Sequence, residues 1–119
     1  MKPKELADDI FAINDDIRYV SIVGPNHEVL ESRMRDGVKP LLSNMGKDDR
    51  WFAGEFAPMI LENAKNSEQA LGDIEYSMTR YRKVTIVVMK IQEYVVTLSV
   101  EPQVTIRDLY DQIIRHISL

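Results

Sequence analysis

The sequence predicts an α+β domain in which a five-stranded antiparallel sheet is flanked by helices, and three observations support this. Residues 74–100 hold three consecutive β-rich segments with too few residues between them for crossover connections. Residues 17–34 hold two further segments of this kind around a turn. Helical periodicity precedes, separates and follows these two blocks, so the predicted order is α-β-β-α-β-β-β-α.

The first block predicts a helix and a hairpin. Apolar residues at helical spacing predict the helix over residues 3–14. Residues 17–23 and 28–34 are rich in β-branched and alternating apolar residues, and they are predicted to be paired strands. Between them Pro25 presets φ for the first central position of a turn, and Asn26 tolerates the second.

A longer second helix is predicted after an irregular connection over residues 36–47. It would begin at Asp48 or Asp49 and kink near Pro58, which has no N–H to donate to the preceding turn. Its apolar side chains cover an arc of roughly 200°, whereas covering one sheet needs only somewhat more than about 100°. One flank is therefore expected to pack on the sheet, and the other on a further helix or a partner molecule.

The second block predicts three strands and a closing helix. Alternation predicts strands over residues 74–79 and 94–100, and the nearly continuous apolar run over 84–91 predicts a central strand covered on both faces. Thr105 followed by Asp108 resembles a capping box at the start of the last helix. The apolar stripe of that helix is Ile106, Leu109, Tyr110, Ile113, Ile114 and Ile117.

Composition fits one soluble domain spanning residues 1–119. The sequence is 45% hydrophobic and 29% charged, and it has no cysteine, which excludes disulfides and thiolate chemistry. A net charge of −4 argues against binding to nucleic acid or insertion at an anionic membrane. No apolar run approaches the roughly 20 residues of a membrane span, so a cytoplasmic protein is expected.

The residues offer little material for catalysis. The two histidines are His27 in a turn and His116 on the polar side of the last helix, and no cysteine accompanies them. A nucleophile needs a base held beside it, and zinc needs clustered His and Cys ligands. We therefore expect no catalytic residue, metal or cofactor.

The order of elements resembles the roadblock / dynein light chain family over essentially the whole chain. IRYVSIVGPNHEVLESRM corresponds to the first hairpin, LGDIEYSMTRYRKVTIVVMKIQEYVVTLSV to the three-strand meander and TIRDLYDQIIRHISL to the closing helix. The chain departs from the family at the turn Gly24-Pro25-Asn26-His27, where members often carry an Asp-x-x-Gly type of turn, and at Pro58. The resemblance implies a non-catalytic homodimer or heterodimer that acts as a scaffold or regulator, often of small Ras-like GTPases.

The resemblance also implies a dimer interface along the long helix and the strand that follows it. The residues at matching positions are Trp51, Phe52, Phe56, Met59, Ile74, Tyr76 and Met78. The residue pattern agrees, because the helix has more apolar arc than one sheet needs and the strand over 74–79 would otherwise leave an open edge. The alternative is that the aromatic residues and Met59 are core within one chain.

Two other functions remain open on the sequence alone. The architecture is also similar to PAS or profilin-like ligand sensors, whose pocket would lie between the sheet and the long helix, lined by Phe56, Met89 and Tyr94. Basic residues near strand ends could form a patch for nucleic acid or an acidic protein partner, or could be solvated charges that protect sheet edges. These residues are Arg33, Arg35, Arg80, Arg82 and Lys83.

Overall fold

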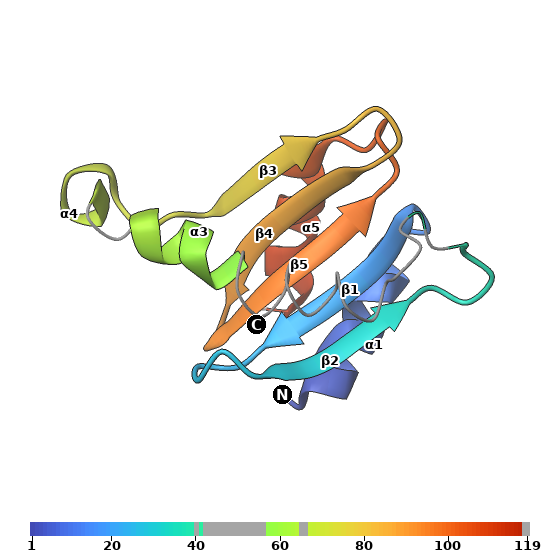
Figure 1. Cartoon of the computed structure of the whole chain (residues 1–119), viewed down its shortest axis with the longest axis horizontal. Coiled ribbons are helices and arrows are strands. Elements are labelled where there is room, and N and C mark those ends of the chain that lie inside the picture. Colours follow the sequence, from blue (N-terminus) through green and yellow to red (C-terminus); the bar gives the residue numbers. More distant parts are fainter. Residues whose placement is uncertain (40, 42–56, 65–66, 118–119) are drawn as a thin grey trace.

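The structure is a computed structural model that describes residues 1–39, 41, 57–64 and 67–117 (Figure 1). Its elements are α1 Pro3–Ile13, β1 Ile17–Val23, β2 Val29–Met34, α3 Ala57–Ala64, α4 Glu68–Leu71, β3 Tyr76–Arg80, β4 Thr85–Ile91, β5 Tyr94–Val100 and α5 Ile106–Ile117. The predicted α+β class and five-stranded antiparallel sheet are confirmed. The predicted start of the second helix at Asp48 or Asp49 lies outside the described residues, which include its later part as α3.

The sheet has the strand order β2-β1-β5-β4-β3, and every neighbouring pair is antiparallel. The first hairpin joins the three-strand meander through β1 and β5, where Val20 lies opposite Leu98 and Ile22 opposite Val96. This pairing leaves β2 at one edge of the sheet and β3 at the other, as Figure 1 shows.

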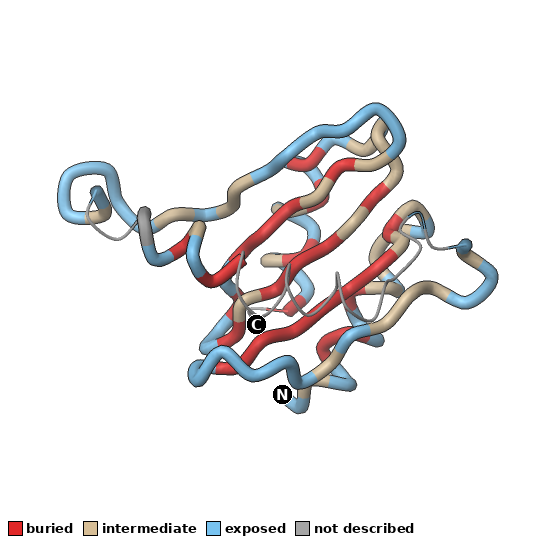
Figure 2. The backbone as a smooth tube through the Cα atoms, viewed as in Figure 1, coloured by how far each residue is buried: buried red, intermediate tan, exposed pale blue. Residues whose placement is uncertain are grey.

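One face of the sheet carries the main core. Helices α1 and α5 cover it, and Figure 2 shows buried backbone concentrated in the central strands. The inward-facing residues of α1, α5 and the three central strands form one apolar cluster, which includes Leu6, Ile10, Val20, Ile22, Val87, Met89, Val96, Leu98, Leu109 and Ile113. The alternate apolar residues of the strands and the apolar stripe of α5 both face this cluster. Their burial on one side produces the periodic patterns from which the sequence predicts these elements.

The opposite face is less apolar. There Ala57 and Leu61 of α3 pack on Val88, with Ile60, Ile74 and Val95 around them. Ser21 and Thr97 lie opposite each other on β1 and β5, and both are buried. Within the described part of the chain neither hydroxyl has a hydrogen-bond partner. Among the described residues, fewer buried apolar side chains therefore lie on this face than on the face under α1 and α5.

Arg35 ties the end of α1 to the sheet. Its Nη2 donates to the backbone carbonyls of Phe11 and Asn14 at 2.7 and 2.8 Å, and its Nε donates to Ile17 O at 2.7 Å. The guanidinium also lies 5.0 Å from the centroid of the Phe11 ring. Since the last turn of α1 has no basic residue of its own, Arg35 supplies the positive charge that its unpaired carbonyls favour.

We therefore expect Arg35→Met to lower the free energy of unfolding by about 2 kcal/mol, because three charge-assisted hydrogen bonds are lost from a half-buried site. Urea denaturation followed by circular dichroism measures this. Arg82→Met, at an exposed position in the turn between β3 and β4, is the matched control and should change the free energy by less than about 0.5 kcal/mol. Equal effects of the two substitutions would contradict the role given to Arg35.

The turn between β4 and β5 carries local strain. Gln92 is the first of the two residues between Ile91 and Tyr94, and its φ is 57°. A side chain with a Cβ disfavours this region, which two-residue hairpin turns usually fill with Gly or Asn. We expect Gln92→Gly to raise the free energy of unfolding by about 0.5 kcal/mol. Thermal denaturation tests this against Glu93→Gly, which has no such strain to relieve and should lower the melting temperature.

Candidate interaction surface

The β3 edge has its outward backbone groups on alternate residues. The N–H of Tyr81 donates to Val84 O at 2.8 Å where the β3–β4 hairpin closes. Along an antiparallel strand, residues that bond to the partner alternate with residues whose N–H and C=O point away from it. Since Tyr81 bonds to Val84, the residues that point away from β4 are Tyr76, Met78 and Arg80. The Met78 side chain is 46% exposed, so this edge presents an apolar residue at its centre.

Tyr76 packs against α5. Its ring centroid lies 5.1 Å from that of Tyr110, with 48° between the ring planes. Burial raises the pKa of the Tyr110 hydroxyl, and the nearby charges of Glu75 and Asp111 raise it further. Met78 follows Tyr76 by two positions and therefore lies on the same face of the sheet.

We expect the raised pKa of Tyr110 to make stability depend on alkaline pH. The neutral phenol is favoured in the folded state, so its contribution is intact below the unfolded pKa of about 10 and is lost as the pH rises through the folded pKa. In a titration of tyrosine ionisation by absorbance near 295 nm, Tyr110→Phe should remove absorbance change from the part of the curve above the ordinary tyrosine pKa. Loss of amplitude at the ordinary tyrosine pKa would contradict the assignment.

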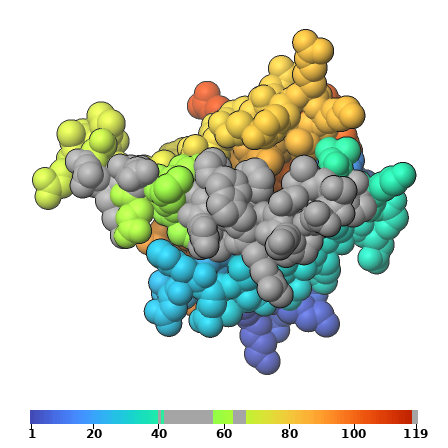
Figure 3. All heavy atoms as spheres, in the orientation of Figure 1, coloured from blue at the N-terminus to red at the C-terminus, as the bar shows by residue number. Residues whose placement is uncertain are grey.

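Helix α3, which packs beside Ile74, carries a second exposed apolar residue. Met59 is 51% exposed, whereas Ala57 and Leu61 on the other side of the helix are buried. Leu71, at the end of α4, is 82% exposed and was not singled out by the sequence, because nothing in the sequence marks α4 as projecting. Figures 1 and 3 show α3 and α4 together at one end of the molecule.

The predicted interface residues that the structure describes lie on two faces of the sheet. Trp51, Phe52 and Phe56 lie outside the described residues. Ile74 and α3, which carries Met59, lie on one side of the sheet, while Tyr76 and Met78 face the α5 side. A surface that used both of these described groups would have to wrap around the β3 edge.

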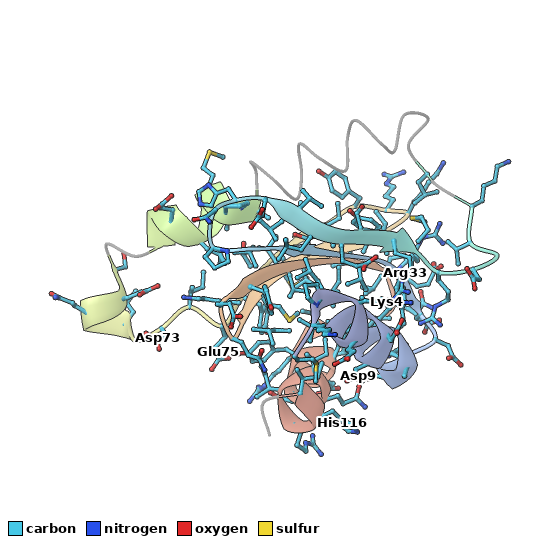
Figure 4. All side chains as sticks on the ribbon, turned by 90° about the horizontal axis from the view of Figure 1, so that it is seen from below. Lys4, Asp9, Arg33, Asp73, Glu75 and His116 are labelled. Atoms are coloured by element: carbon cyan, nitrogen blue, oxygen red, sulfur yellow. The ribbon has the colours of Figure 1, made fainter. Side chains whose placement is uncertain are left out.

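The predicted basic residues separate into two groups. Arg33 and Arg35 belong to the β2 edge, whereas Arg80, Arg82 and Lys83 belong to the β3 edge and its hairpin. Strands β1, β5 and β4 lie between the two edges, so the fold does not bring the groups together. Figure 4 shows Arg33 far from Glu75, which precedes β3.

The ligand pocket expected beneath the long helix is not lined as the sequence suggested. Met89 and Tyr94 belong to the core under α1 and α5, on the face of the sheet opposite α3. The alternation of β4 and β5 cannot tell one face of the sheet from the other, which is why this assignment was wrong.

Both histidines are exposed. His27 is exposed in its turn, where its N–H donates to Gly24 O at 3.0 Å and confirms Pro25 and Asn26 as the central residues. His116 is exposed, with Nδ1 3.0 Å from Gln112 O. Among the described residues, no group of three His, Cys, Asp or Glu side chains is placed to hold a metal ion. No described helix is long and apolar enough to cross a membrane.

The described elements form a five-stranded antiparallel sheet with α1 and α5 on one face and α3 on the other, an α+β fold similar to that of roadblock domains. The chain matches DUF6659, a family of unknown function, over residues 2–118, and it belongs to that family. No curated protein matches the sequence.

Solved structures confirm the predicted resemblance at the level of the fold. A Roadblock/LC7 domain from Streptomyces avermitilis aligns with a TM-score of 0.70 at 7% identity, covering 99% of this chain and 93% of that one. MglB from Myxococcus xanthus aligns at 0.63 and 10% identity, covering 96% and 95%. A chain of a LokiProfilin2/rabbit actin complex aligns at 0.52 and 14% identity, covering 98% and 96%.

Proposed function

We propose that this chain is a non-catalytic, dimeric protein-interaction module that acts as a scaffold or regulator. The observation that supports it best is the β3 edge, which carries exposed Met78. Exposed Met59 adds a second apolar side chain on α3, a helix that packs beside Ile74, two residues before β3. An unpaired strand edge with an apolar centre favours pairing with another chain. The roadblock fold fits this role, and it makes a small Ras-like GTPase the first class of partner to test.

A two-fold pairing of β3 with itself has one favourable register. When the axis passes at Met78, the outward backbone groups of Met78 meet those of its copy. In that register Tyr76 lies opposite Arg80 of the second chain on the same face, and Ser77 lies opposite Thr79. A guanidinium beside an aromatic ring, with two methionines at the centre, is a compatible set of cross-strand pairs.

The oligomeric state tests the proposal. Wild-type chain should be a dimer at micromolar concentration by light scattering, and Met78→Glu should weaken the dimer at least about tenfold by placing two carboxylates at the axis. Val29→Glu, at a 37% exposed position on the opposite edge, is the matched control and should remain dimeric. A monomeric wild type, or equal behaviour of the two variants, would remove the basis for the proposal.

Cross-linking tests the register separately. The chain has no cysteine, so a single introduced thiol reports on one position. Met78→Cys should form a disulfide-linked dimer under mild oxidation, because directly opposed residues have Cα atoms about 5.5 Å apart, within disulfide range. Thr79→Cys, which would face Ser77 rather than itself, should cross-link much more slowly. Equal rates would show that the strands do not pair about Met78.

Regulation of a GTPase is tested by enzyme kinetics. A purified Ras-like GTPase from the same organism should hydrolyse GTP at a changed rate when the dimer is added, and Met78→Glu should reduce the change if the dimer is the active form. A rate unchanged by either protein would exclude the regulatory role and leave the scaffold role.

A further inference from the structure

The opposite edge of the sheet, formed by β2, has an independent set of binding features. Val29 and Leu30 are 37% and 40% exposed there. The N–H of Arg35 donates to Arg18 O at 2.8 Å, so the backbone groups of Arg35 point towards β1. Along β2, residues that point towards β1 alternate with residues that point away from it. Met34, one position earlier, therefore directs its N–H and C=O away from β1, towards the outer side of the sheet.

Two guanidinium groups lie beside this edge, over one aromatic ring. Arg33 and Arg35 are two residues apart and so share the face of β2 that α1 covers. Their Cζ atoms lie 5.3 and 5.0 Å from the centroid of the Phe11 ring. An open cavity of about 390 Å³ adjoins them, lined by Asp8, Phe11, Arg33, Met34, Arg35 and Asp36.

The positive charges of this cavity are only partly matched. Arg33 Nη2 pairs with Asp8 Oδ1 at 2.6 Å, but the buried Nε of Arg33 has no hydrogen-bond partner in the described part of the chain. Arg35 gives its hydrogen bonds to the backbone carbonyls of Phe11, Asn14 and Ile17, none of which carries a formal charge. Asp36 lies exposed at the rim. These hydrogen bonds of the Arg35 guanidinium therefore go to no carboxylate, and a carboxylate from another molecule would be attracted to its charge.

We propose that the β2 edge binds an extended acidic segment of another protein. The segment would add a sixth strand beside β2 and place an Asp or Glu side chain in the cavity at Arg33 and Arg35. Strand addition uses the outward backbone groups of β2, and the cavity supplies the choice of side chain. Since the two arginines are two residues apart, acidic residues at alternate positions of the segment would face both. This surface is distinct from the β3 edge proposed for dimerisation.

A second copy of this chain fits the edge less well. Helix α1 lies directly beneath β2, as Figure 4 shows, and Asp8 of that helix contacts Arg33. A two-fold pairing of β2 with itself would bring α1 of each chain towards the other. A single extended strand has no such helix, which favours a peptide segment as the occupant.

The test uses a fluorescein-labelled peptide, Thr-Val-Glu-Val-Glu-Val-Thr, and the full chain at low salt. Fluorescence anisotropy should show saturable binding, and a peptide with Lys in place of both Glu residues should bind at least about tenfold more weakly. A peptide with N-methyl groups on the backbone nitrogens that would face β2 should lose binding, because it cannot donate to the edge. Equal affinity of either altered peptide would overturn the proposal.

Two variants place the site on the chain. Arg33→Gln should weaken binding about tenfold, whereas Arg82→Gln, with the same charge change in the turn between β3 and β4, should leave it unchanged. Met34→Pro removes an N–H that points away from β1 and leaves the hydrogen bonds between β1 and β2 in place. Because Pro is tolerated at such edge positions, the chain should fold but no longer bind the peptide. Amide chemical-shift changes should map to residues 29–34. Changes confined to β3, or unaltered binding by both Arg33→Gln and Met34→Pro, would refute the assignment.

Discussion

The pairing of β1 with β5 is the interaction on which the rest of the fold depends. It joins two blocks that are far apart in sequence, and its central pairs, Val20 with Leu98 and Ile22 with Val96, are fully buried. Arg18 and Glu101 extend the connection at one end through a 2.7 Å ion pair, beside the bond from Glu101 N–H to Asp16 O. The apolar cluster that holds α1 and α5 draws its strand residues from both the first hairpin and the three-strand meander, so it is complete only when β1 and β5 are paired.

The sequence predicts the elements well where local pattern and tertiary environment agree. β1 and β5 have their predicted bounds because β-branched residues fill both strands and bury most positions. The strand expected from Ile74 instead begins at Tyr76, because Ile74 packs with Val88 and α3 before the ladder to β4 starts. Periodicity locates an apolar side chain on one side of a strand but does not show which layer it will meet.

The order of the strands in the sheet, which decides which residues lie at each edge, could not be predicted from local sequence patterns. Arg33 lies near the end of β2 and Arg80 ends β3, and the pairing of β1 with β5 places them at opposite edges of the sheet. Placing Met89 and Tyr94 under α1 and α5 likewise requires knowing which face those helices cover. The high exposure of Leu71 depends on the direction in which α4 leaves the domain, which the residue types of α4 do not predict. The edge position of β3 was accessible to sequence because of the chain order implied by the resemblance, and exposed Met78 fits it.

The contrast between the two faces of the sheet has a consequence for how the molecule opens. The face under α1 and α5 is lined by aliphatic side chains, whereas the other carries Ser21 and Thr97 at its centre, with hydroxyls that have no partner among the described residues. Undocking α3 exposes fewer of the described apolar side chains than parting α1 and α5 from the first face, so it costs less free energy. Local opening of the described part of the domain is therefore expected at α3 before the sheet separates. In hydrogen exchange, amides of α3 should exchange through local opening, while those of β1 and β5 should wait for global unfolding.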